Sequence, residues 1–272
     1  MSDAWLAGPV TSVAYGWRLE RGDGVTLGFT SHDRNVAVDG VMLRASPGML
    51  PSSIVESIGL ETDGLEVNGA LTSEAIRADD LASGRWDAAR LEVFLFDWSN
   101  PSAGKRILAV GELGAVSYSG AAFEAELLGL TRLLDRPVVP QTSPGCRTGF
   151  CDADCGLSGL RFRHVRAVGE TNGEIVTLTA DVVPNGFAYG QLRWLDGANT
   201  GLSADIVANT ANQVTLARPA HFAVLSGARI ELIEGCDKRL ETCATRFANA
   251  INFRGEPHLP GNDLLTRYPG AG

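Results

Sequence analysis

Cysteines constrain this sequence more than any other residue type. Four of the five fall into two pairs, Cys146 with Cys155 and Cys236 with Cys243, and 80 residues separate the pairs. An odd number of cysteines argues against a disulfide framework in a reducing compartment, where thiols stay free unless they are catalytic or metal-bound. We therefore expect these four side chains to converge on one structural metal site.

The remaining composition indicates a globular protein of the cytoplasm. Hydrophobic residues make up 44% and charged residues 20% of the 272 residues, which is ordinary for one large or several small folded domains. No apolar run approaches the roughly 20 residues of a membrane-spanning helix. Residues 1–5 lack the basic and apolar regions of a signal peptide. We expect synthesis in the cytoplasm and no membrane association.

The charge distribution argues against a protein that grips nucleic acid. The formal net charge is −9, and the 23 basic residues are scattered along the chain. A DNA-binding surface needs clustered basic side chains that neutralise phosphates. Sequence-specific DNA binding is therefore not expected.

Residues 1–140 predict a β-rich, barrel-like domain. Short β-prone runs alternate with turn signals, and Asp39-Gly40 predicts a hairpin. One helix is expected over Ser73–Trp86 with Ser73 as its N-cap, and residues 127–134 are expected to turn helical before Pro137. The expected strands are Val25–Thr30, Val36–Arg44, Leu65–Val67, Leu91–Phe96, Ile107–Val116 and Ala122–Gly129.

Residues 161–235 predict a separate, small β-barrel inserted between the two cysteine pairs. The metal would then pin the two ends of the insertion together. A short, helical, metal-binding part would comprise residues 141–160 and 236–255, called the cysteine region below. Residues 256–272 are expected to form an extended arm on a neighbouring subunit. The expected barrel strands are Ile175–Leu178, Gln191–Trp194, Ala204–Val207, Gln213–Leu216 and Ala228–Leu232.

The spacing within each pair bears on the identity of the metal. Neither C-x8-C nor C-x6-C matches the C-x2–4-C spacing of structural zinc sites, whereas iron–sulfur clusters accept four thiolates with looser spacing. If Cys236 and Cys243 shared one helix, about 10.5 Å of rise would separate them, which is too far for a single ion. The spacing therefore favours an iron–sulfur cluster, with zinc as the alternative.

Three basic residues and a fifth cysteine accompany the two pairs. Arg147, Lys238 and Arg239 could offset the negative charge that four thiolates leave around either metal. Cys151 breaks the two-pair pattern and is interpreted as a spare thiol. The alternative to metal binding is that the cysteines fill a core as small hydrophobes. Gly-Cys pairs among charged residues are poor core sequence, however.

Catalytic motifs are weak in this sequence. Ser31, His32 and Asp33 are the residue types of a hydrolase, but consecutive residues do not easily form a relay, and no G-x-S-x-G elbow accompanies them. His164 and His258 are isolated, and no phosphate-binding glycine loop is present. We expect no enzymatic activity.

Several segments carry motifs of a known family. Together with the layout of the two cysteine pairs, they resemble the phage tail-tip hub family. That family includes the lambda-like tail-tip protein L, the hub protein of alphaproteobacterial gene transfer agents and phage BR0599-like proteins. The segments that carry the resemblance are Leu27–Arg34, Gly64–Leu71, Gly235–Asn249, Asn252–Gly255 and Pro257–Asp263.

The resemblance implies a structural protein at the distal end of a non-contractile tail, in a phage, a prophage or a gene transfer agent. It implies a ring of three subunits, each holding a [4Fe–4S] cluster through Cys146, Cys155, Cys236 and Cys243. A distal tail protein and a tip or central fibre protein would be its neighbours. DNA would pass only as cargo, which suits the acidic net charge. The alternatives are a zinc-stapled structural protein of the cytoplasm and, less favoured, a tail-associated hydrolase.

Overall fold

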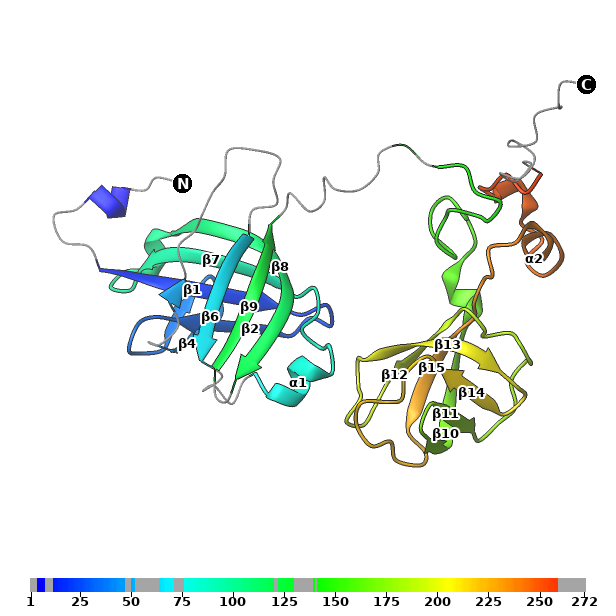
Figure 1. The fold of residues 1–272 in the computed structure, drawn as a ribbon. Helices are drawn as coiled ribbons and strands as arrows, with labels where there is room; N and C mark the ends of the chain where they lie inside the picture. The colour runs from blue at the N-terminus through cyan, green and yellow to red at the C-terminus, as the bar shows by residue number, and fades with distance from the viewer. Residues whose placement is uncertain are drawn as a thin grey trace, which may run out of the picture. The chain divides into compact units, whose positions relative to one another are not determined.

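The computed structural model describes residues 4–7, 12–46, 50–51, 64–70, 76–119, 122–129, 139 and 141–258. The chain divides into two compact units, Met1–Val138 and Val139–Gly272. Both units are built mainly from β-strands, as Figure 1 shows, so the prediction of a mostly β protein is confirmed.

The N-terminal unit is a nine-stranded sheet in the order β3-β4-β2-β1-β7-β8-β9-β6-β5. Among the described residues the edge strands β3 and β5 do not pair with each other, so the predicted barrel-like domain is a half-barrel. The strands are β1 (Val13–Glu20), β2 (Thr26–Thr30), β3 (Val36–Val38), β4 (Val41–Ala45), β5 (Leu50–Pro51), β6 (Gly64–Ala70), β7 (Arg90–Asp97), β8 (Lys105–Ser119) and β9 (Ala122–Gly129).

The centre of this sheet is buried on both faces. Because side chains alternate along a strand, the pairing of β1 with β7 places Trp17 beside Val93 on one face. Gly16 lies beside Phe94 on the other face. A Cβ on Gly16 would lie 2.5 Å from the Phe94 ring, so this face needs a glycine there. Two separate hydrophobic clusters result, one on each side of the strands.

Short local elements follow the turn signals in part. Asp39 and Gly40 have φ of 48° and 77° and join β3 to β4, which confirms the predicted hairpin. Helix α1 (Ala78–Ala82) begins later than predicted, after Arg77, and no side chain caps it. Ser73, the predicted cap, lies outside the described residues. The 3₁₀ turns of this unit are η1 (Ala4–Ala7) and η2 (Pro101–Ala103).

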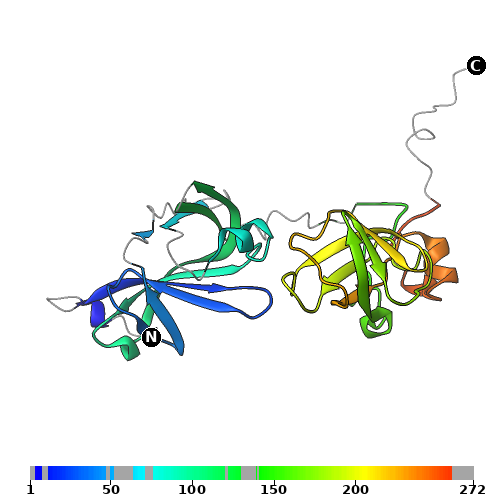
Figure 2. The same cartoon turned by 90° about the horizontal axis from the view of Figure 1, so that it is seen from below.

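The C-terminal unit contains a closed barrel in the order β10-β11-β14-β13-β12-β15, which confirms the predicted small barrel. All strand pairs around the barrel are antiparallel. Figure 2 shows the barrel after a quarter turn of the view. The strands are β10 (Arg163–Asn172), β11 (Ile175–Leu178), β12 (Gln191–Trp194), β13 (Ser203–Asn209), β14 (Gln213–Leu216) and β15 (Arg229–Ile233).

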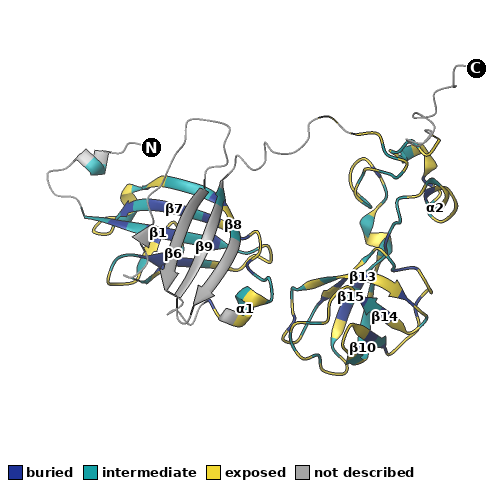
Figure 3. Ribbon diagram, viewed as in Figure 1, coloured by how far each residue is buried: buried dark blue, intermediate teal, exposed yellow. Residues whose placement is uncertain are grey.

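The barrel encloses its own hydrophobic core. Val168, Leu192, Ile230 and Leu232 are fully buried, and Trp194 is 2% exposed. Burial alternates along β12 and β15, as expected for a sheet with one face inward. In Figure 3 the buried positions of this unit colour parts of the barrel strands, whereas the loops are mostly exposed or intermediate.

The remaining described elements of this unit lie beyond one end of the barrel, where β10 starts and β15 stops (Figure 1). They are η4 (Gly159–Phe162), α2 (Leu240–Thr245) and η5 (Ala250–Asn252). Leu127 to Gly129 belong to β9 rather than to a helix, and residues 130–134 lie outside the described residues. The same holds for most of the predicted arm, from residue 259 onward. None of the helices described is long and apolar enough to span a membrane.

Candidate metal centre

Three segments that are distant in the sequence meet at the end of the barrel. The Cys146 N–H donates to the Lys238 carbonyl at 2.8 Å, and the Arg147 N–H donates to the Arg254 carbonyl at 3.1 Å. The Ser143 carbonyl accepts from the Glu256 N–H at 2.7 Å. The segment before the barrel is thus held between the two segments that follow it.

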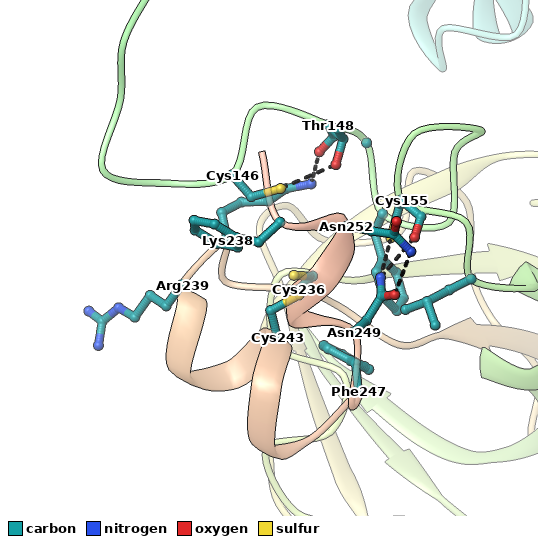
Figure 4. Close-up of a pocket in the computed structure, with 14 residues that line it drawn as sticks. Cys146, Thr148, Cys155, Cys236, Lys238, Arg239, Cys243, Phe247, Asn249 and Asn252 are labelled. Atoms are coloured by element: carbon teal, nitrogen blue, oxygen red, sulfur yellow. Dashed lines mark hydrogen bonds between the residues drawn. The ribbon is translucent and has the colours of Figure 1, made fainter. Parts of the chain in front are cut away.

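The four paired cysteines line one pocket at this junction (Figure 4). Cys155 and Cys243 are each 9% exposed, whereas Cys146 and Cys236 are half-buried. The pocket holds about 330 Å³ of space free of atoms, including its part open to solvent. The structure therefore brings the two predicted pairs together at one site.

Cys236 and Cys243 do not share a helix. Helix α2 begins at Leu240, so only Cys243 lies on it, and Cys236 belongs to the extended segment after β15. Between them Lys238 has φ of 64°, a left-handed conformation that reverses the chain direction. This turn removes the separation of about 10.5 Å that a continuous helix would impose.

Cys155 is fixed by a carboxylate-capped loop. The side chain of Asp152 accepts from the Cys155 N–H at 2.7 Å and from the Gly149 N–H at 2.5 Å. The hydrogen bond from the Cys155 N–H is the main reason that the pKa of Asp152 lies below its usual value. Gly156 follows with φ of 70°, where a glycine carries no steric penalty.

The thiols of Cys146, Cys236 and Cys243 differ in the effects that shift their pKa values. Burial raises the pKa of Cys236 and of Cys243, and for Cys243 the other cysteines add to this effect. Burial also acts to raise the pKa of Cys146, but hydrogen bonds from Thr148 and the Arg254 N–H outweigh it and lower that pKa. Cys146 is therefore the thiol most readily converted to a thiolate among these three.

The basic residues near the pairs play different parts. Lys238 donates to the Thr148 carbonyl at 2.5 Å, and its charge favours the thiolate forms of Cys146 and Cys236. Arg147 instead pairs with Glu256 on the third segment. Arg239 lines the pocket. Of the three, Lys238 has the most direct effect on the thiols.

The donor set fits a thiolate-bound metal group. Four cysteines converge on a partly buried pocket beside a lysine, which is the donor chemistry of zinc and iron–sulfur sites. Across the described part of the chain, however, no three Cys, His, Asp or Glu side chains lie close enough for a single metal ion. A tetrahedral zinc with Zn–S bonds of about 2.3 Å would hold the sulfurs roughly 3.8 Å apart.

Cys151 stands apart from the other four cysteines. It is not among the residues that line the pocket, and its φ is 63°. Burial and the nearby Cys155 and Cys236 raise the pKa of its thiol. A Cβ on Gly159 would lie 3.5 Å from the Cys151 Cβ, an ordinary contact.

Three phenylalanines pack together at the pocket, and they were not singled out in the sequence analysis. Phe150, Phe162 and Phe247 form a triangle with ring centroids 5.0 to 5.6 Å apart. Arg246 lies over the Phe247 ring and donates to the Gly186 carbonyl of the barrel at 2.6 Å. Aromatic residues near the cysteines were the only signal of this support.

The histidines noted in the sequence have local structural contacts. His32 Nδ1 accepts from the Arg34 N–H at 3.0 Å, and Ser31 Oγ accepts from the Tyr15 N–H at 3.0 Å. His164 Nε2 lies 2.8 Å from Glu234 at the barrel end, and His258 is exposed. None of these four residues lines the cysteine pocket.

Comparisons with known proteins agree on one family. Residues 2–158 match the model of a baseplate hub protein, N-terminal attachment domain, and residues 185–263 match the phage conserved hypothetical protein BR0599. A chain in a solved structure, described as the virion of a native gene transfer agent particle, is 34% identical. That match covers 99% of this chain and 95% of the other, with a TM-score of 0.87. No curated protein matches the sequence.

Proposed function

Because this chain belongs to the phage baseplate hub family and is a structural component of a phage-like or gene transfer agent particle, not an enzyme, we propose that a cysteine-bound [4Fe–4S] cluster stabilises it as a tail-tip hub. Cys146, Cys155, Cys236 and Cys243 would hold the cluster. The observation that carries this proposal is the convergence of these four cysteines, and not of Cys151, on one pocket.

The role proposed for the cluster is that of a cross-link. When bound, it would supply stabilising metal–thiolate bonds between the segments before and after the barrel. The chain's own residues shape the site: Asp152 fixes the loop of Cys155, and Lys238 favours the charged thiols. The Thr148 hydroxyl shares a hydrogen bond with the Cys146 sulfur at 3.2 Å, and the Arg254 N–H donates to that sulfur at 3.4 Å.

The assembly proposed is a homotrimeric ring between a distal tail protein and a tip or central fibre protein. The solved chain of 34% identity comes from an assembled particle, which supports a role among other tail proteins. The ring would surround part of the DNA channel. Of the 32 acidic residues, 19 lie in residues 1–138 against 11 basic ones, a balance that would keep passing DNA from adhering. A strongly basic lumen in an assembled particle would refute the channel proposal.

Anaerobic purification followed by metal analysis tests the cluster. We expect broad absorbance near about 400 nm and about four irons and four sulfides per chain, the content of a cubane bound by four cysteines. One zinc and no colour would assign the same four cysteines to a different metal. A protein with all five cysteines reduced and no metal would refute the proposal.

Particle assembly tests the structural role. Cys155→Ser removes one proposed ligand, and Cys151→Ser removes the cysteine that does not line the pocket. We expect the first substitution to block tail assembly and the second to leave it unchanged. Particles that transfer DNA normally with Cys155→Ser would contradict the cross-link.

A further inference from the structure

Asn249 is a buried polar residue that connects the two cysteine pairs. It is 6% exposed and follows α2, where its N–H donates to the Cys243 carbonyl at 2.9 Å. Its side chain reaches Cys155, which is 94 residues away in the sequence. One residue thus contacts a proposed ligand from each pair.

The carboxamide of Asn249 is oriented by its partners. Nδ2 donates to the Cys155 carbonyl at 2.8 Å, and it lies 3.7 Å from the Cys155 Sγ, within hydrogen-bonding range of sulfur. A carbonyl oxygen only accepts, so the atom that faces it must be the nitrogen. Oδ1 accepts from Asn252 Nδ2 at 2.8 Å. Figure 4 shows the side chain of Asn249 directed at Cys155 and that of Asn252 directed at Asn249.

The backbone near Cys155 leaves room for this arrangement. A Cβ on Gly156 would lie 3.2 Å from Nδ2 of Asn252, closer than most side-chain contacts. Because Gly156 has none, Asn252 can lie against it and hold the oxygen of Asn249. Gly156 thus makes room for Asn252, and Asn252 orients the carboxamide of Asn249. As a result, an Nδ2–H of Asn249 is directed toward the Cys155 sulfur.

We propose that Asn249 is a positioning residue of the metal centre, which orients Cys155 and donates an N–H···S hydrogen bond to its sulfur. This inference rests on the proposed function, since it assigns the partner of a cluster ligand. Hydrogen bonds to ligand sulfurs are one determinant of the reduction potential of an iron–sulfur cluster, because they stabilise negative charge on the sulfur. Residues that orient metal ligands typically contribute a factor of roughly 10–100 to metal affinity.

A purely structural role is the competing explanation, and the barrel provides its control. Asn209 is also buried, at 4% exposed, and its Nδ2 donates to the Val183 and Thr210 carbonyls at 2.9 Å. It satisfies backbone groups only and does not line the cysteine pocket. Replacing either asparagine by alanine leaves buried backbone groups without partners, which destabilises the fold. Of these two asparagines, Asn249 alone has a contact with a proposed ligand sulfur.

The test compares Asn249→Ala and Asn209→Ala in the full chain, purified without oxygen. The readouts are the reduction potential by voltammetry and iron retention by titration with a chelator. We expect Asn249→Ala to shift the potential to a more negative value and to lower iron affinity by roughly 10–100-fold. Asn209→Ala should keep both values while lowering the unfolding temperature.

Equal potentials and equal iron affinities in Asn249→Ala and the unmodified protein would overturn the inference. If Asn249→Ala does not fold, Asn252→Ala replaces it, because it keeps the donor but removes the group that orients it. An unchanged potential in that variant would overturn the inference equally. Unmodified protein without iron and sulfide would instead refute the cluster itself, so the two failures are distinguishable.

Discussion

Replacing Cys155 by serine should open the cysteine region while the barrel stays folded. The barrel has a core of twelve buried residues, none of them a cysteine. Its closing strands pair from Arg163 with Ile233 onward without any residue of the cysteine region. The proposed cross-link therefore acts mainly on the segments beyond that pair.

The size of the effect follows from the loop that the cross-link closes. With the barrel folded, the path from Cys155 to Arg163 and from Ile233 to Cys236 is about 11 residues, and closing such a loop is worth about 2.8 kcal/mol. With the barrel unfolded, the loop between these cysteines is about 81 residues and the value rises to about 4.5 kcal/mol. Loss of the cross-link should thus weaken local protection by about 2.8 kcal/mol, which corresponds to roughly a 100-fold change in opening.

Hydrogen exchange resolved by segment measures this effect. In Cys155→Ser, amides of 143–156 and 239–256 should exchange roughly 100-fold faster through local opening. Amides of β12 and β15 that exchange only on complete unfolding should be accelerated more, by roughly 1,000-fold, because the longer loop then applies. Cys151→Ser should exchange like the unmodified protein. Unchanged exchange in the cysteine region would refute the reasoning.

Three further predictions concern the packing and charges of the barrel. Leu192→Ala, at a fully buried site, should cost about 2–5 kcal/mol in urea unfolding, whereas Leu225→Ala, 75% exposed, should cost less than about 0.5 kcal/mol. Gly235→Ala should cost about 3 kcal/mol or more, because its Cβ would lie 1.9 Å from the Ala188 oxygen; a normal thermal midpoint would contradict this close approach. Hydrogen bonds from an arginine of β15 lower the pKa of Asp196. The contribution of Asp196 to folding stability is therefore present above its unfolded pKa of about 3.9 and is lost as pH falls through its lower folded pKa. Asp196→Asn should accordingly reduce the loss of stability between about pH 5 and pH 2.

The barrel was predictable from sequence because its signals are local. Gln191–Trp194 alternates outward and inward residues and is bounded by turns, and the strand has these bounds in the structure. Asp39-Gly40 likewise specifies its hairpin through two residues that adopt positive φ. In both cases the pattern and the turn chemistry act within a few residues.

Closure of the N-terminal sheet was not predictable in this way. Whether a sheet closes depends on which strands pair, and β2 pairs with β4 in parallel although β3 lies between them in the sequence. The start of α1 was also missed, because Ile76 is used as a buried core residue before the helix begins. Tertiary packing decided both features.

In the candidate site, too, local features could be predicted from the sequence and long-range contacts could not. Cysteine spacing indicates that the pairs belong together. The left-handed turn at Lys238, between Cys236 and Cys243, could not be predicted, because a lysine and not a glycine adopts the positive φ. Asn249 was part of a recognised motif, yet nothing in the sequence assigns its side chain to Cys155. Contacts across 94 residues depend on the folded barrel between them.

The position of the cysteines explains why a cross-link would be placed there. Inside the barrel, hydrophobic burial suffices, because every strand contributes residues to one core. Beyond its end, Phe150, Phe162 and Phe247 form an aromatic cluster, and all three are only half-buried. Two chain segments without a core of their own gain little from burial and pay the full entropy of ordering. Metal–thiolate bonds between Cys146, Cys155 and the later pair would supply the free energy that this small aromatic cluster lacks.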